Sequence, residues 1–136
     1  MANKGTITVL MIEPNRHPYM KTINHSLDDL QSLVGGIITA TYPWDDPVAL
    51  IAGDESLYDA SLAWNRFIDD YHFIRGNFFL CGLSPDDFDD IPADLAQKYA
   101  EMFWMPESFI NLGGSLMVIK EDDGTKPSLR SVKVRL

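Results

Sequence analysis

Two short stretches of this chain bring together several residue types that could do chemistry: 72-HFIRGNFFLCG-82 and, shortly before it, 64-WNR-66. The longer stretch contains a histidine, an arginine, an asparagine and the only cysteine, Cys81. A nucleophilic cysteine needs an activating base and an electropositive, partly open setting. On a strand, Cys81 would share a face with Phe79 and Leu83, and a free cysteine usually behaves as a small hydrophobe. We therefore expect Cys81 to be a core residue.

The polar residues near this stretch could instead bind a ligand. Arg66 and Arg75 are two cations in an acidic chain, and the planar guanidinium fork suits carboxylate or phosphate groups. If the loop at 60–67 packs beside the strand at 73–82, the arginines meet an anionic group at one polar patch. The candidate ligand-binding residues are Trp64, Asn65, Arg66, Arg75 and Asn77.

A structural interpretation of the same residues stays open. Arg66 could pair with Asp69 or Asp70, while Asn65 satisfies backbone groups of its loop. Sequence alone does not decide between this arrangement and a ligand site.

Other kinds of site lack a motif. The histidines His17, His25 and His72 are not spaced four residues apart, and neither a zinc-protease helix nor a calcium loop is present. The paired glycines Gly35 and Gly36 follow a helical pattern, whereas a phosphate-binding loop precedes one. We expect no metal, no cofactor and no catalytic residue.

The chain is acidic, with 20 Asp and Glu against 11 Lys and Arg and a net charge of −9. Such a surface repels nucleic acid, so we expect no direct nucleic-acid binding. The small acidic groups either are solvated loops and helix starts or imitate a phosphate backbone along one face. A single cysteine suits a reducing compartment, and the apolar run at 6–12 is too short to span a membrane. We expect a cytoplasmic protein that does not enter a membrane.

The pattern of the first half predicts strands and one helix. Ser26 is a natural N-cap and Gly35 a natural terminator, so a helix is expected at about 26–34. Strands are expected at 6–13, 19–23, 36–42 and 48–52, the last two forming a hairpin. Residues 53–67 are expected to form an irregular loop.

In the second half, 72–82 reads as a strand that is buried on both faces after Asn77, with a bulge or a close approach at Gly76. A helical start is expected at 84–88, a helix at about 92–103, and strands at 115–120 and 131–136. This order predicts one α+β domain over 1–136, with a mostly antiparallel or mixed sheet and two main helices. Residues 120–136 are expected to form a peripheral hairpin or tail.

The end of the chain, 126-KPSLRSVKVRL-136, interleaves basic and apolar residues. Charges of this kind protect an edge strand or a frayed end against aggregation. The alternative is a contact patch for an acidic partner, or for the acidic face of a second copy in a homo-oligomer. Both interpretations stay open.

Four segments together resemble one family. They are 27-LDDLQSLVGGII-38, 62-LAWNR-66, 74-IRGNFFLCG-82 and 94-DLAQKYAEMFWMPESF-109. The chain resembles the bacterial domain-of-unknown-function family 3846 over about residues 6–110. The resemblance implies a shared α+β fold and residence on a plasmid, phage or integrated element. It implies no activity and assigns no catalytic residue.

These observations predict a non-enzymatic binding or accessory protein of a bacterial mobile element. Its expected partner is an anionic small molecule or a host protein. A second hypothesis is an acidic protein-interaction or counter-defence protein that mimics nucleic acid. A third is a small enzyme that acts on an anionic substrate.

Overall fold

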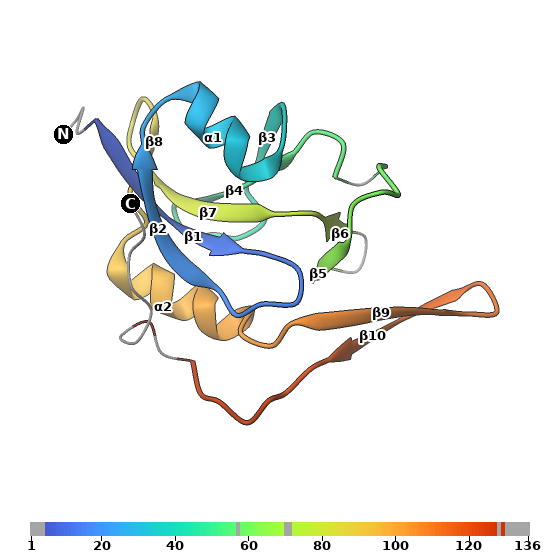
Figure 1. The fold of residues 1–136 in the computed structure, drawn as a ribbon. Helices are drawn as coiled ribbons and strands as arrows, with labels where there is room; N and C mark the ends of the chain where they lie inside the picture. Colours follow the sequence, from blue (N-terminus) through green and yellow to red (C-terminus); the bar gives the residue numbers. More distant parts are fainter. Residues whose placement is uncertain (1–4, 57, 70–71, 128, 130–136) are drawn as a thin grey trace.

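The structure, a computed structural model, describes residues 5–56, 58–69, 72–127 and 129. It confirms an α+β fold with mostly antiparallel sheets and two helices (Figure 1). In chain order the elements are β1 (Thr6–Ile12), β2 (Tyr19–Asn24), α1 (Leu27–Val34), β3 (Ile38–Thr41), β4 (Val48–Gly53), β5 (Trp64–Asp69), β6 (His72–Arg75), β7 (Phe78–Leu83), β8 (Phe88–Asp89), α2 (Ala93–Met102), β9 (Glu107–Leu112) and β10 (Ser115–Lys120).

The main sheet has the order β2-β1-β7-β4-β3, with β8 attached to β7, and every pairing is antiparallel. One core lies between the sheet and α2, and it contains Phe78 and Leu80. The other lies between the sheet and α1, and it contains Phe79 and Cys81. The expected central strand, buried on both faces, is therefore confirmed, and so is the core position of Cys81.

Local signals define α1 as the sequence predicts. The Ser26 hydroxyl accepts a hydrogen bond from the backbone N–H of Asp29 at 3.2 Å. At the other end Gly35 adopts φ 85°, and its N–H donates to the carbonyl of Gln31 at 2.9 Å. A left-handed backbone conformation costs little energy at a glycine, because glycine has no Cβ atom. This explains why the helix ends at Gly35.

The strand expected at 72–82 is in fact two strands. Gly76 has φ 73°, and the chain leaves the β5–β6 hairpin there to enter the main sheet as β7. Within the segment expected to be an irregular loop, residues 64–67 belong to β5, because they pair with β6. Pairing between distant segments determines both the break at Gly76 and the strand at 64–67. A local sequence pattern does not show which segments pair.

One further expectation is wrong, and one strand was missed. Residues 84–87 form a turn and not a helix start, since the Ser84 N–H donates to the Asp87 carbonyl at 2.8 Å and β8 then pairs with β7. Strand β9 was not expected. It forms with β10 an antiparallel hairpin that closes at Gly113 and Gly114, both with positive φ. The strand expected at 131–136 lies outside the described residues.

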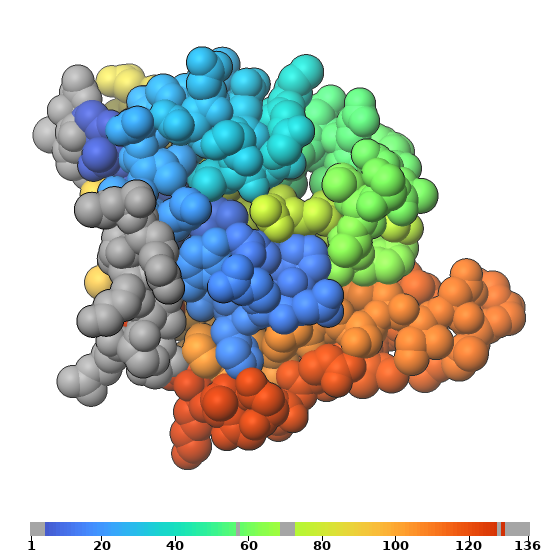
Figure 2. Space-filling view, in the orientation of Figure 1, coloured from blue at the N-terminus to red at the C-terminus, as the bar shows by residue number. Residues whose placement is uncertain are grey.

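The β9–β10 hairpin extends away from the main sheet as an arm (Figures 1 and 2). Its attachment is aromatic: the ring of Phe109 on β9 stacks on that of Trp64 on β5, with centroids 5.0 Å apart. Among the described residues, no helix is both long and apolar enough to cross a membrane.

Candidate functional site

Asn65 and Arg66, two of the predicted ligand-binding residues, are completely buried at the start of β5. The Arg66 guanidinium donates to the carbonyl of Phe103 at 2.9 Å and to that of Arg16 at 2.8 Å. A third bond, 2.9 Å long, goes to the side-chain oxygen of Asn65. The guanidinium thus spans the residue that follows α2 and the loop between β1 and β2.

Asn65 extends the same network in the opposite direction. Its side-chain amide donates to the carbonyl of Ile12 at 2.9 Å and to that of Gly76 at 2.7 Å. The first carbonyl is at the end of β1 and the second lies at the break between β6 and β7. Asn65 therefore satisfies backbone groups, as the structural interpretation proposed, although those groups belong to distant segments.

The charged guanidinium of Arg66 is buried away from solvent. Burial lowers the pKa of Arg66 to about 10, and the carboxylate of Glu107 opposes this shift. The guanidinium consequently stays protonated near neutral pH. Glu107 is itself buried, and its carboxylate accepts a hydrogen bond from the backbone N–H of Phe67 at 2.8 Å. The position of Arg66 beside the carbonyl groups at the end of α2 also suits the negative end of the helix dipole.

Arg75 and Trp64 form a separate, more exposed pair. The Arg75 guanidinium carbon lies 3.7 Å from the centre of the Trp64 ring, which is cation–π geometry. The same guanidinium donates to the carbonyl of Leu62 at 3.1 Å. Asn77 is engaged elsewhere, because its amide donates to the carbonyl of Leu33 in α1 at 3.2 Å.

The five predicted residues therefore fall into three groups with different partners. Asn65 and Arg66 share a buried network, Arg75 and Trp64 share a stack, and Asn77 contacts the end of α1. An anion at Arg66 would have to displace bonds to backbone carbonyls. The alternative pairing with Asp69 or Asp70 falls on side chains outside the described part of the structure.

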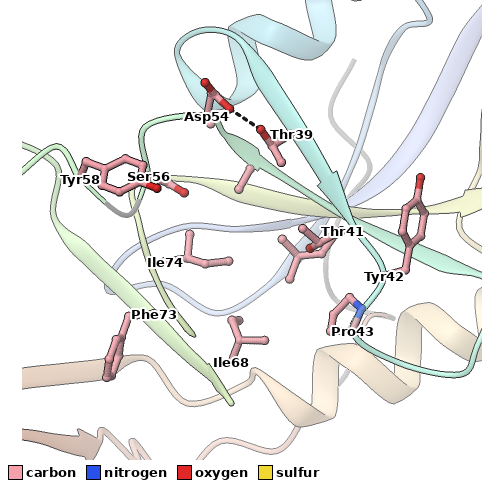
Figure 3. A pocket seen from close by; sticks show the side chains of 13 residues that line it. Thr39, Thr41, Tyr42, Pro43, Asp54, Ser56, Tyr58, Ile68, Phe73 and Ile74 are labelled. Atoms are coloured by element: carbon pink, nitrogen blue, oxygen red, sulfur yellow. Dashed lines mark hydrogen bonds between the residues drawn. The ribbon is translucent and has the colours of Figure 1, made fainter. Parts of the chain in front are cut away.

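The structure instead places a cavity of about 420 Å³ between β3–β4 and the β5–β6 hairpin (Figure 3). Its apolar lining comes from both sides, including Leu50 and Ala52 of β4 and Ile68, Phe73 and Ile74 of the hairpin. The polar lining includes Thr39, Thr41, Asp54, Ser56 and the tyrosines Tyr42 and Tyr58. We call this cavity the β3 groove.

One side of the β3 groove is an open strand edge. β3 is the last strand of the main sheet, and no described strand pairs with its outer edge. The N–H of Asp54 donates to the carbonyl of Ile37 at 2.7 Å, which fixes the phase of the β3–β4 ladder. By alternation, the backbone groups of Ile38 and Ala40 point outward. An incoming strand could pair with them.

The electrostatics of the β3 groove favour a neutral or positive ligand. Among the described residues that line it there is no lysine, arginine or histidine, and Asp54 is the one carboxylate. The Thr39 hydroxyl donates to this carboxylate at 2.6 Å, as the dashed line in Figure 3 shows. Within the described residues, no cluster of His, Cys, Asp and Glu could hold a metal ion.

Sequence reasoning missed the β3 groove because its residues belong to no motif. A weak signal existed in 38-ITAT-41, where threonine alternates with apolar residues. Ile38 and Ala40 pack on the core beneath α1, whereas Thr39 and Thr41 line the groove. Hydroxyl groups at alternate positions of an edge strand are compatible with a binding wall, although they are equally common on solvated faces.

Fold and groove together define an α+β domain whose antiparallel sheet is covered by one helix on each face and carries an open edge beside a cavity. The chain belongs to the family described as Domain of unknown function (DUF3846), whose model matches residues 7–104. This finding confirms the resemblance seen in the sequence. Neither the curated proteins nor the solved structures contain a significant match. The matched residues include the β3 groove and Arg66, and end before β9.

Proposed function

We propose that this protein is a non-enzymatic binding protein that recognises an extended, positively charged peptide segment of a partner protein in the β3 groove. The observation that carries the proposal is a mostly apolar cavity that lies beside a strand edge with which no described strand pairs. Main-chain hydrogen bonds at such an edge supply affinity, and pockets for alternate side chains supply specificity.

The peptide would add to the sheet as a strand next to β3. Its backbone would pair with the outward groups of Ile38 and Ala40. Successive side chains of a strand point to opposite faces, so every second side chain would enter the groove. A groove wall of Leu50, Ala52 and Ile74 suits an aliphatic or aromatic side chain there.

Charge decides which peptide is favoured. The chain carries a net charge of −9, and the described residues of the groove lining include Asp54 and no cation. Lysine or arginine beside the apolar side chains would therefore strengthen binding and accelerate association. An anionic small molecule suits this groove less well, because no described residue of the lining is a cation that could pair with it.

The proposal includes the setting of the protein. Residence on a mobile element is supported by the resemblance to the family, and a cytoplasmic location by the single, buried Cys81. In that setting the partner would be a host protein. Host proteins that bind nucleic acid expose basic segments, so the counter-defence hypothesis is a special case of the same interaction.

A selection from a displayed library of random peptides tests the proposal. We expect enriched peptides to alternate apolar residues with Lys or Arg. Binding of a synthetic peptide with an enriched sequence, measured by fluorescence anisotropy, should weaken at high salt. Enriched peptides that are acidic, or no enrichment at all, would overturn the proposal.

Two variants locate the peptide. Ala40→Pro removes an outward N–H without removing a bond to β4, and proline is tolerated on edge strands. Ala52→Leu fills the floor of the groove. Both should abolish binding while the thermal unfolding midpoint shows that the domain is folded. The control Leu27→Ala, at an exposed residue of α1, should bind as the original chain does. Equal binding by all variants would place the peptide elsewhere.

A further inference from the structure

The β9–β10 arm has an inner and an outer face. The inner face contains Phe109, which stacks on Trp64 and so attaches the arm to the β5–β6 hairpin. The outer face contains the alternate residues of each strand: Ser108, Ile110, Leu112, Ser115, Met117 and Ile119. We call these six residues the outer face of the arm. The arm lies beyond the segment that the family model matches.

The outer face exposes large apolar side chains. Ile110 is 39 % exposed, Leu112 56 %, Met117 46 % and Ile119 41 %. Scattered single apolar residues on a surface need no explanation, but these four are neighbours on one hairpin face. Cross-strand pairing joins Ile110 to Met117 at the centre.

The positions of large and small residues make this face complementary to itself. Leu112 pairs with Ser115 at the tip, and Ser108 pairs with Ile119 at the base. The two large end residues therefore occupy one diagonal, and the two serines occupy the other. When one copy is turned over so that its tip lies on the base of the other, each large end residue meets a serine. Layers that place large side chains opposite small ones interdigitate well.

The distribution of charge also favours a second copy of the chain as the partner of the outer face. None of the six residues is ionisable, whereas the chain as a whole carries a net charge of −9. Two copies can approach through an uncharged face with the least repulsion. Glu121 lies at the base, where its carboxylate accepts a hydrogen bond from Ser108 at 2.6 Å. The tip-to-base arrangement keeps the Glu121 carboxylates of the two copies at opposite ends of the contact.

We propose that the outer face of the arm is the contact between two copies of this chain, which pack face to face with their arms antiparallel. Ile110 then meets Ile110 of the second copy, and Met117 meets Met117. Such a two-fold contact uses the same surface on both copies. The contact is confined to one hairpin face, so the dimer is of the weak, concentration-dependent kind. It does not depend on the peptide proposed for the β3 groove.

Sedimentation equilibrium over a range of protein concentrations provides the first test. We expect a monomer–dimer equilibrium that shifts towards dimer as salt screens the like net charges. Met117→Glu should weaken the dimer by at least about tenfold, because it places two carboxylates against one another in an apolar contact. The control Leu27→Glu adds the same charge at an apolar residue that is 59 % exposed on α1, and should dimerise as the original chain does.

Cross-linking tests the arrangement itself. A short bismaleimide should link two copies of the Ile110→Cys variant, whereas Leu27→Cys should stay monomeric. Leu112→Cys should link to Ser108→Cys in a mixture more efficiently than to itself. The native Cys81 is buried and does not compete. A chain that is monomeric at every concentration, a dimer that Met117→Glu leaves intact, or binding of the arm to neutral lipid vesicles in place of a second copy would overturn the proposal.

Discussion

Replacing Arg66 by lysine tests whether the Arg66 guanidinium has a structural role or binds a ligand. The guanidinium donates to five acceptor atoms, which are the carbonyl oxygens of Glu13, Arg16, Asn65 and Phe103 and the side-chain oxygen of Asn65. A lysine ammonium keeps the positive charge but offers three N–H donors from one nitrogen. At least two acceptors would therefore lose their partner.

The cost follows from the burial of this site. Arg66 is 0 % exposed, so bulk water cannot replace a lost donor without opening the structure. A hydrogen bond to a charged group contributes about 1.5–3 kcal/mol, and two lost bonds amount to about 3–6 kcal/mol. A domain of this kind has a free energy of unfolding of about 5–15 kcal/mol. Arg66→Lys should thus remove a large fraction of the stability.

Urea unfolding followed by tryptophan fluorescence measures this loss. With a slope of about 2 kcal/mol per molar urea, the midpoint should fall by about 1.5–3 M. The control Arg75→Lys changes an arginine that is partly exposed and stacked on Trp64, and should cost less than about 1 kcal/mol. A midpoint shift below about 0.5 M for Arg66→Lys would refute the structural role of the guanidinium. Stabilisation of the original chain by phosphate, lost in the variant, would restore the anion-site hypothesis.

Three further predictions concern the central strand and its entry. Gly76→Ala should destabilise the domain by about 1–2 kcal/mol in urea unfolding, because φ is 73° there and the added carbon would lie 3.4 Å from the Leu62 side chain. Gly82→Ala should cost more, with the added carbon 2.2 Å from the Asp90 carbonyl oxygen, and a cost equal to that of Gly76→Ala would contradict the close contact. Burial raises the pKa of Cys81 to about 12, so a thiol reagent at about pH 8 should modify this cysteine only after unfolding.

The elements that could be predicted from the sequence are those with local causes. Ser26 and Gly35 define α1 through bonds within a few residues, and proline-bounded apolar runs give β1 and β4. Cys81 was correctly expected in the core because both faces of its strand are apolar. In each case the deciding interaction involves sequence neighbours or simple alternation.

The elements that could not be predicted depend on distant partners. Gly76 fits a bulge as well as a change of sheet, and only the pairing of β6 with β5 selects the second. Ser84 followed by proline and two acids resembles a helix start, yet the attachment of β8 to β7 makes it a turn. Gly82 allows this attachment, because any side chain there would collide with the backbone of Asp90.

The role of Arg66 could not be predicted from the sequence either. An arginine that binds an anion and an arginine that binds carbonyl groups have the same identity in the sequence. Carboxylate partners could leave a pattern of acidic residues, but backbone carbonyls belong to every residue and leave none. The backbone carbonyls that accept from Arg66 belong to Glu13, Arg16, Asn65 and Phe103, which have no residue type in common. The β3 groove also leaves no pattern in the sequence, because it is a space that β3, β4 and the β5–β6 hairpin leave open. A binding protein whose site is a strand edge beside such a space therefore reveals its function through three-dimensional packing, and not through motifs.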